Sequence, residues 1–250
     1  MYFEVVTLFP EVVGVVGRFG VVGRALERGL LSLGTTDPRE FATDPHRTVD
    51  ARPYGGGPGM VMKVEPLRSA IRAARAKLPE GSRTVFLSPQ GRVFDQAVAR
   101  EYSDLPGLLL VAGRYEGMDE RLLCMEADEA LTVGDYVVSG GELPAMLVVD
   151  AVARLVPGVL GDENSAVEDS FSDGLLDCPH YTRPEEVGSL RVPSVLLSGD
   201  HEAIRRWRLK QSLGRTWRMR PDLLAGRELT TEERGLLDEY IAERATGGAD

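Results

Sequence analysis

The chain has 250 residues, with 29 Lys or Arg against 39 Asp or Glu and a formal net charge of −10. This length can bury one substantial core and leaves room for a second, smaller domain. Charged residues interrupt the apolar start, no stretch approaches the roughly 20 apolar residues that span a bilayer, and Cys124 and Cys178 lack the spacing of zinc or redox sites. We therefore expect a cytoplasmic protein without a signal peptide, a membrane contact or a structural metal site.

Short apolar or β-branched runs alternate with helix-like segments over the first 110 or so residues, which is typical of α/β proteins. Proline and glycine mark the ends of two predicted helices, at Pro79 and at Pro157-Gly158. The predicted elements are a strand over 2–9, an amphipathic stretch to about residue 30, a helix over 64–78, strands over 84–88 and 108–112, and a helix over 142–156.

An acidic segment follows these elements. Residues 161–180 hold six carboxylates and no Lys or Arg, and residues 161–175 have few aliphatic side chains, a composition that predicts a flexible linker. From about residue 176 the chain is expected to be mainly helical, most clearly over 203–217 and 231–244. The sequence thus predicts a domain over 1–160, a linker over 161–175 and a small helical domain over 176–250.

The usual fingerprints of nucleotide-binding enzymes are missing from the sequence. Gly14, Gly17 and Gly20 are spaced GxxGxxG inside a helix-like run, which does not make the turn of a GxGxxG site, and no GxxxxGK[ST] loop occurs. Several Gly- or Pro-rich loops follow predicted strands instead, where ligands bind in open α/β sheets. One such loop is more often a plain turn, but together they predict a ligand site. They are RPYGGGPGM (52–60), LSPQG (87–91), AGRYEG (112–117), VGDY (133–136) and SGGELP (139–144).

A basic segment near the C-terminus offers a surface for nucleic acid despite the negative net charge. Residues 201–220 hold seven Lys or Arg and one acidic residue. In a helix, one stripe of this segment would be apolar, formed by Leu209, Leu213 and Trp217. We expect RNA phosphates to contact arginines on another face, with a solvated basic face as the alternative. These arginines are Arg205, Arg208 and Arg215.

Six stretches stand in this order along the chain: RPYGGGPGM, LSPQGR, GRYEGMDER, VGDYVVSGGELPA, EDSFSDGLLDCPHYTRP and WRLKQSLGRTW. Together they closely resemble the bacterial TrmD family of tRNA (guanine-N1)-methyltransferases, and the likeness covers nearly the whole chain. That family belongs to the SPOUT methyltransferases, so the resemblance implies a deep trefoil knot in the α/β domain, which connectivity rules alone would not suggest. It also implies tRNA as the partner and a homodimer with sites at the subunit interface.

The resemblance implies that the Gly- and Pro-rich loops bind S-adenosylmethionine. Val133 and Val138 stand where other family members carry Ile and Leu, a change that keeps an apolar wall. The implied cofactor-binding residues are Leu87, Ser88, Pro89, Gly113, Glu116, Val133, Gly134, Tyr136, Val138, Gly140, Gly141 and Pro144.

Methylation of guanine at N1 requires removal of the N1 proton, for which a nearby carboxylate is suitable. The resemblance implies that Asp169 is this base and that Arg154 stabilises charge on the guanine or orients it. Taken without the resemblance, Asp169 is a solvated linker charge and Arg154 a partner in a structural salt bridge. The implied product is 1-methylguanosine on the 3′ side of the anticodon, with a guanine required before it. The family also allows Mg²⁺ as a further cofactor, whose ligands no residue marks.

Two alternatives stay open at this point. A related SPOUT methyltransferase could act on ribosomal RNA or on a ribose hydroxyl, which needs no Asp base, and a chain with this fold could bind RNA without catalysis. His46, His180 and His201 do not form a metal-like pattern. Cys178 and His180 are interpreted as packing residues inside the CPHYTRP motif.

Overall fold

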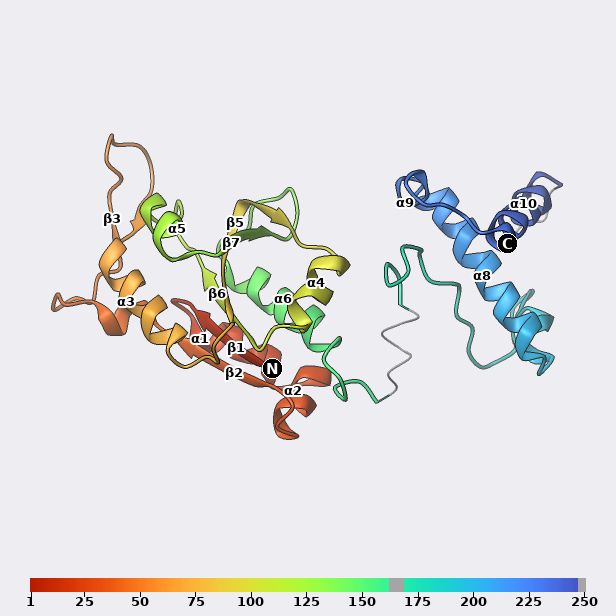
Figure 1. The fold of residues 1–250 in the computed structure, drawn as a ribbon, viewed down its shortest axis with the longest axis horizontal. Coiled ribbons are helices and arrows are strands. Elements are labelled where there is room, and N and C mark those ends of the chain that lie inside the picture. Colours follow the sequence, from red (N-terminus) through yellow and green to blue (C-terminus); the bar gives the residue numbers. More distant parts are fainter. Residues whose placement is uncertain (162–168, 247–250) are drawn as a thin grey trace. The chain divides into compact units, whose positions relative to one another are not determined.

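The computed structural model describes residues 1–161 and 169–246. The chain divides into two compact units, Met1–Glu163 and Asn164–Asp250, and each is described by itself (Figure 1). The division falls inside the segment that the composition predicts as a linker. No helix in the described ranges is both long and apolar enough to cross a membrane.

A five-stranded parallel sheet forms the centre of the first unit (Figure 1). Parallel strands need long crossover connections, which the helices between them provide. The predicted α/β class is therefore confirmed. The strand order is β2 (Ser32–Thr36), β1 (Tyr2–Val6), β6 (Gly107–Ala112), β5 (Arg83–Val93) and β7 (Glu129–Thr132), with every neighbouring pair parallel.

Helices cover both faces of this sheet because its central strands are apolar on both sides. In β6, Leu108 and Leu110 belong to one core cluster, whereas Leu109 and Val111 belong to the other, as the alternation of strand side chains requires. The first cluster includes residues of α1 (Pro10–Gly14), α2 (Gly20–Glu27), α4 (Gln96–Ser103) and α6 (Glu142–Ala153). The second includes residues of α3 (Val64–Arg75) and α5 (Glu120–Glu126). A separate antiparallel pair joins β3 (Asp50–Ala51) to β4 (Val61–Met62).

The strands predicted over 84–88 and 108–112 and the helices predicted over 64–78 and 142–156 are confirmed in type by β5, β6, α3 and α6. The stretch after the first strand differs from the prediction, because it is broken into α1, a 3-10 turn over Val15–Gly17, and α2. The break before α2 lies at Phe19, whose backbone is extended, and Gly20 then begins α2 with a φ of +68°, which suits glycine rather than a continuous helix. The first strand also ends earlier than predicted, at Val6, because α1 starts at Pro10.

The second unit packs α8 (His201–Met219) against α10 (Thr231–Ala245), with the short α9 (Asp222–Ala225) between them. Thr230 and Glu233 form a capping box that begins α10. The prediction of mainly helical structure is wrong for residues 176–200. They contain a small hairpin of β8 (Glu186–Val187) and β9 (Leu190–Arg191) and a 3-10 turn over Ser194–Leu197. Leu175, which the composition places in the linker, is buried in the core of this unit beside Leu213 and Leu236.

Candidate active site

A cavity of about 420 Å³ lies where β5, β6 and β7 lead into loops. In parallel sheets, the loops at the carboxyl ends of the strands are the usual place for a ligand. Four Gly- or Pro-rich loops contribute: residues 87–91 inside β5, 112–117 after β6, and 133–136 and 139–144 after β7. The lining consists of residues 87–90, 113–118, 120, 123, 131–133, 136–141 and 144.

Eleven of the twelve residues that the resemblance assigns to the cofactor line this one cavity; the exception is Gly134. Gly134 has a φ of +146°, and a Cβ added there would lie 2.6 Å from a ring carbon of Tyr136. It therefore allows Tyr136 to occupy its place in the wall. The assignment of these residues to a cofactor stays a prediction, while their convergence is a property of the fold.

A bulge in β5 places one wall of the cavity. Leu87 and Arg92 both stand opposite Leu131 of β7, so residues 88–91 leave the strand ladder between them. Three of these expelled residues, 88–90, line the cavity. Gly91 returns the chain to the ladder, and a Cβ there would lie 2.2 Å from the backbone nitrogen of Leu131.

A close backbone approach forms another wall. The Gly141 N–H donates to the Gly113 carbonyl oxygen at 2.8 Å, and a Cβ at Gly141 would lie 2.6 Å from Cα of Ala112. Only glycine permits two backbone segments to come this close. The start of α6 is thereby held against the end of β6.

The loop over residues 52–60 joins the loop that follows β6. The Glu116 N–H donates to the Met60 carbonyl oxygen at 2.9 Å, and a Cβ at Gly59, where φ is +77°, would collide with the Glu116 side chain. Tyr115, which lines the cavity, has a φ of +61°. Such a conformation is uncommon outside glycine and is concentrated at functional sites.

Comparison with known proteins identifies the family of the chain. A family model described as "tRNA (Guanine-1)-methyltransferase TrmD" matches residues 1–226. The chain belongs to the tRNA (guanine-1)-methyltransferase family.

Three relatives similar to the chain are each named tRNA (guanine-N(1)-)-methyltransferase. The protein of Chromohalobacter salexigens is 61% identical over 252 residues, covering 98% of this chain and 94% of the relative. That of Methylococcus capsulatus is 62% identical over 243 residues, covering 97% of each. That of Salmonella newport is 59% identical over 245 residues, covering 98% of this chain and 96% of the relative.

The two predicted catalytic residues of this tRNA (guanine-1)-methyltransferase family member lie in different units. Arg154 is the C-terminal cap of α6 in the first unit. Asp169 begins the described part of the second unit, and its carbonyl oxygen accepts the Ser172 N–H at 3.1 Å. The segment after Asp169 is fixed to the helices of that unit, because the Leu176 N–H donates to Thr216 Oγ1 at 2.9 Å. The roles of Arg154 and Asp169 stay predictions.

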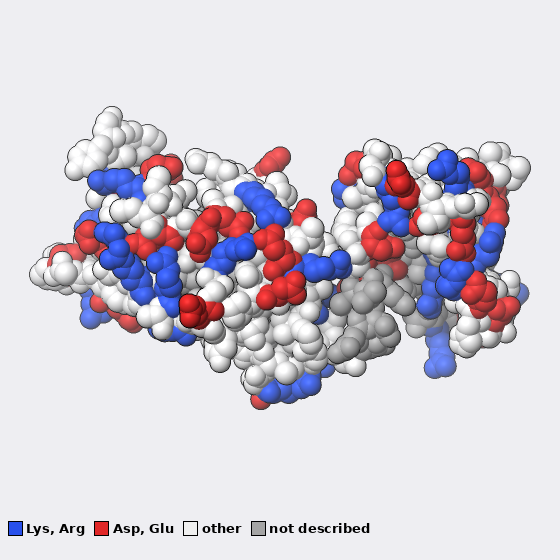
Figure 2. Space-filling view, viewed as in Figure 1, with Lys and Arg blue, Asp and Glu red and all other residues white. Residues whose placement is uncertain are grey.

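Helix α8 carries the predicted RNA-contacting arginines, but not all of them are equally available. Arg205 forms ion pairs with Glu202 and with Glu232 of α10, and Figure 2 shows acidic and basic side chains side by side on this unit. Three further cations of the segment are also paired: Arg206 with Glu239, Lys210 with Glu243 and Arg220 with Asp222. Within the described ranges, Arg208, Arg215 and Arg218 have no ion pair with a carboxylate. Arg218 was missing from the predicted set.

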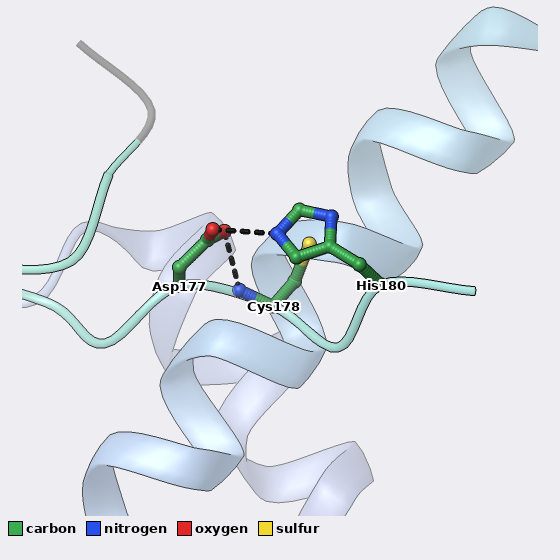
Figure 3. A group of neighbouring side chains, drawn as sticks. All are labelled: Asp177, Cys178 and His180. Carbon is green, nitrogen blue, oxygen red and sulfur yellow. Dashed lines mark hydrogen bonds and ion pairs between the residues drawn. The ribbon is translucent and has the colours of Figure 1, made fainter. Parts of the chain in front are cut away.

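Asp177, Cys178 and His180 come together in the second unit, with their ligand atoms within 4.8 Å of one another (Figure 3). Both carboxylate oxygens of Asp177 are in use, since Oδ1 accepts the Cys178 N–H at 2.6 Å and Oδ2 contacts His180 Nε2 at 2.7 Å. Burial, and then the nearby Asp177, raises the pKa of the Cys178 thiol to about 11, which disfavours the thiolate that a metal binds. Cys178 is buried, which fits the predicted packing role, whereas the His180 side chain is 74% exposed and contacts Asp177 without being packed.

Proposed function

We propose that the protein is a tRNA (guanine-N1)-methyltransferase that uses S-adenosylmethionine to methylate the guanine on the 3′ side of the anticodon, giving 1-methylguanosine. Membership of the family supports the reaction, and the convergence of eleven predicted residues on one cavity is the observation that carries the site. A cytoplasmic location and a requirement for a preceding guanine are part of the same proposal.

The cavity suits a methyl donor of nucleoside size. A volume of about 420 Å³ lies within the range of small-molecule sites, and glycines at its rim leave backbone N–H and C=O groups accessible to a purine or ribose. Leu87, Val133, Val138 and Pro144 provide apolar lining. Bound there, S-adenosylmethionine supplies an electrophilic methyl group. Mg²⁺ stays a prediction for which we propose no ligands.

In the proposed mechanism, the side chains of the protein handle the proton and the charge on the base. With S-adenosylmethionine bound as the methyl donor, the carboxylate of Asp169 would accept the proton that N1 of guanine loses as N1 takes up the methyl group. The guanidinium of Arg154 donates hydrogen bonds to the guanine, which stabilises the negative charge that develops on its oxygen.

We also propose the SPOUT knot and a homodimer with shared sites. Membership of the family supports the knot. Exposed apolar side chains on and beside α1 and α6, two helices that contact each other, support the dimer, since exposed apolar surface marks interfaces. These side chains include Phe9, Val12, Leu143 and Leu147, which are 38–58% exposed. Sedimentation equilibrium would detect the dimer.

Incubation with labelled S-adenosylmethionine and two tRNA transcripts that differ only in the target guanine tests the function. We expect label in the guanine-containing transcript alone, and chromatography of the digested RNA should show 1-methylguanosine. A ribose-methylated nucleoside would favour a related SPOUT enzyme, as would label in ribosomal RNA when that is supplied in a parallel incubation. Calorimetry that detects RNA binding without S-adenosylmethionine binding would favour a non-catalytic RNA-binding protein.

Charge-reversal variants of α8 should distinguish the arginines that contact tRNA from those that form ion pairs between α8 and α10. The double variant Arg208→Glu/Arg215→Glu is expected to weaken tRNA binding at least about tenfold and to flatten its salt dependence, because two phosphate contacts are lost. Arg206→Glu serves as the control: its ion pair with Glu239 lies between α8 and α10, so the thermal midpoint should fall more than the affinity. Unchanged tRNA affinity in the double variant, measured by filter binding at several salt concentrations, would contradict the assignment.

A further inference from the structure

Arg114 lies in the cavity wall and makes contacts there that the spacing of residues in the sequence does not predict. It lies in the loop after β6, lines the cavity and is 23% exposed. Its Nε donates to Oε2 of Glu142 at 2.8 Å, and its Nη1 donates to the Ser139 carbonyl oxygen at 3.2 Å. Gly140 lies between these contacts, and a Cβ there would lie 2.2 Å from Arg114 Nε. One guanidinium therefore holds both ends of the segment that leads into α6.

Glu142 is the carboxylate that holds this guanidinium in place. It is 1% exposed and lies in the first turn of α6, where the helix dipole favours a negative charge. Its second oxygen, Oε1, accepts the Thr7 hydroxyl at 2.8 Å, and Thr7 Oγ1 in turn accepts the Phe9 N–H at 2.9 Å. The Arg114 guanidinium stands 4.4 Å from the centre of the Phe9 ring. Both carboxylate oxygens are thus satisfied by groups from different loops.

The charge of this carboxylate has a consequence for the ligand. A buried carboxylate is costly unless it is paired, and here its partner lines the ligand cavity. S-adenosylmethionine carries a positive sulfonium, which an uncompensated guanidinium in the same cavity would repel, and this repulsion is weakly screened away from solvent. Glu142 cancels that charge without lining the cavity itself.

We propose that Glu142 is a positioning residue of the methyl-donor site. It holds Arg114 against Ser139 and Gly140, and it neutralises the guanidinium so that the cavity accepts a cationic ligand. This inference rests on the proposed function, because it assigns a role in binding S-adenosylmethionine.

The substitution Glu142→Gln tests the charge, because glutamine keeps the shape and can still accept the Arg114 N–H. Calorimetry should compare S-adenosylmethionine with S-adenosylhomocysteine, which lacks the methyl group and the sulfonium charge. We expect the Kd for S-adenosylmethionine to rise roughly tenfold and that for S-adenosylhomocysteine to change less than about twofold. The double variant Arg114→Gln/Glu142→Gln removes both charges and should restore the wild-type ratio of the two Kd values. Arg114→Gln alone should shift that ratio the opposite way, which keeps the test available if Glu142→Gln fails to fold.

Glu126 provides a matched control. It is also buried, 3% exposed, and is paired with arginines that do not line the cavity: Arg68, Arg72 and Arg75. Glu126→Gln should leave both Kd values unchanged. If Glu142→Gln weakened the binding of both ligands equally, Glu142 would have a purely structural role, and if it weakened neither, Glu142 would have no role at this site. Either result would overturn the inference. Wild-type protein that binds neither ligand would instead refute the proposed methyl-donor site.

Discussion

Replacement of Asp169 by Asn is expected to slow methyl transfer to tRNA by about 10²- to 10⁴-fold while leaving the Kd for S-adenosylmethionine unchanged. Asparagine keeps the size of the side chain but cannot accept the N1 proton. The cavity lies in the first unit and Asp169 in the second, so the substitution leaves the lining of the cavity intact. Single-turnover rates at saturating substrate, combined with calorimetry, measure the two effects separately.

Asp173→Asn is the control for this prediction. Asp173 lies in the same acidic segment, and its Oδ1 accepts the Leu175 N–H at 3.1 Å, a contact that the amide oxygen of asparagine can also make. This variant should retain the wild-type rate. An Asp169→Asn protein that folds, binds the methyl donor and transfers methyl groups at the normal rate would remove Asp169 from the mechanism.

Gly141→Ala is expected to weaken S-adenosylmethionine binding by about tenfold to a hundredfold, corresponding to overpacking that costs about 1–3 kcal/mol. The added Cβ would lie 2.6 Å from Cα of Ala112, so relief requires the backbone of the cavity wall to move. A side-chain rotation cannot provide it. Calorimetric titration with S-adenosylmethionine measures the loss of affinity, and a thermal melt measures the accompanying loss of stability.

Gly235→Ala serves as the matched glycine control. Gly235 lies inside α10, and nothing is within 4 Å of a Cβ built there. Because alanine favours a helix interior over glycine, this variant should gain about 1 kcal/mol of stability and bind S-adenosylmethionine normally. If Gly141→Ala also bound S-adenosylmethionine normally, the prediction would be wrong, because the cavity wall would tolerate the movement of its backbone.

The elements that sequence could predict are those with a strong local pattern. All six residues of β6 are buried and apolar, and α3 has a clear amphipathic repeat between Pro66 and Pro79. By contrast, β2 reads SLGTT and β7 reads EALT, and neither pattern indicates a strand. Their pairing with β1 and β5 determines their structure, and a single segment carries no record of that pairing.

The candidate site likewise contains features that the sequence predicts and features that it does not. Glycines in a sequence indicate positions where the backbone comes close to another segment or a ligand, so the loops at Gly113, Gly140 and Gly141 could be predicted as site loops. The contact between Thr7 and Glu142 joins residues 135 positions apart, and no spacing rule reaches that far. Likewise, the sequence predicts that Arg205 of α8 is free to contact RNA, but it is paired with Glu232, 27 residues away.

The bulge in β5 has a thermodynamic consequence for the cavity. Residues 88–91 leave the sheet, yet both flanking residues remain paired with Leu131 of β7. A loop clamped at both ends by strand pairing has little conformational entropy left to lose when a ligand arrives. The surface that Ser88 and Pro89 add to the cavity is therefore already ordered in the folded protein, and a ligand that contacts it would bind with little cost of ordering this loop.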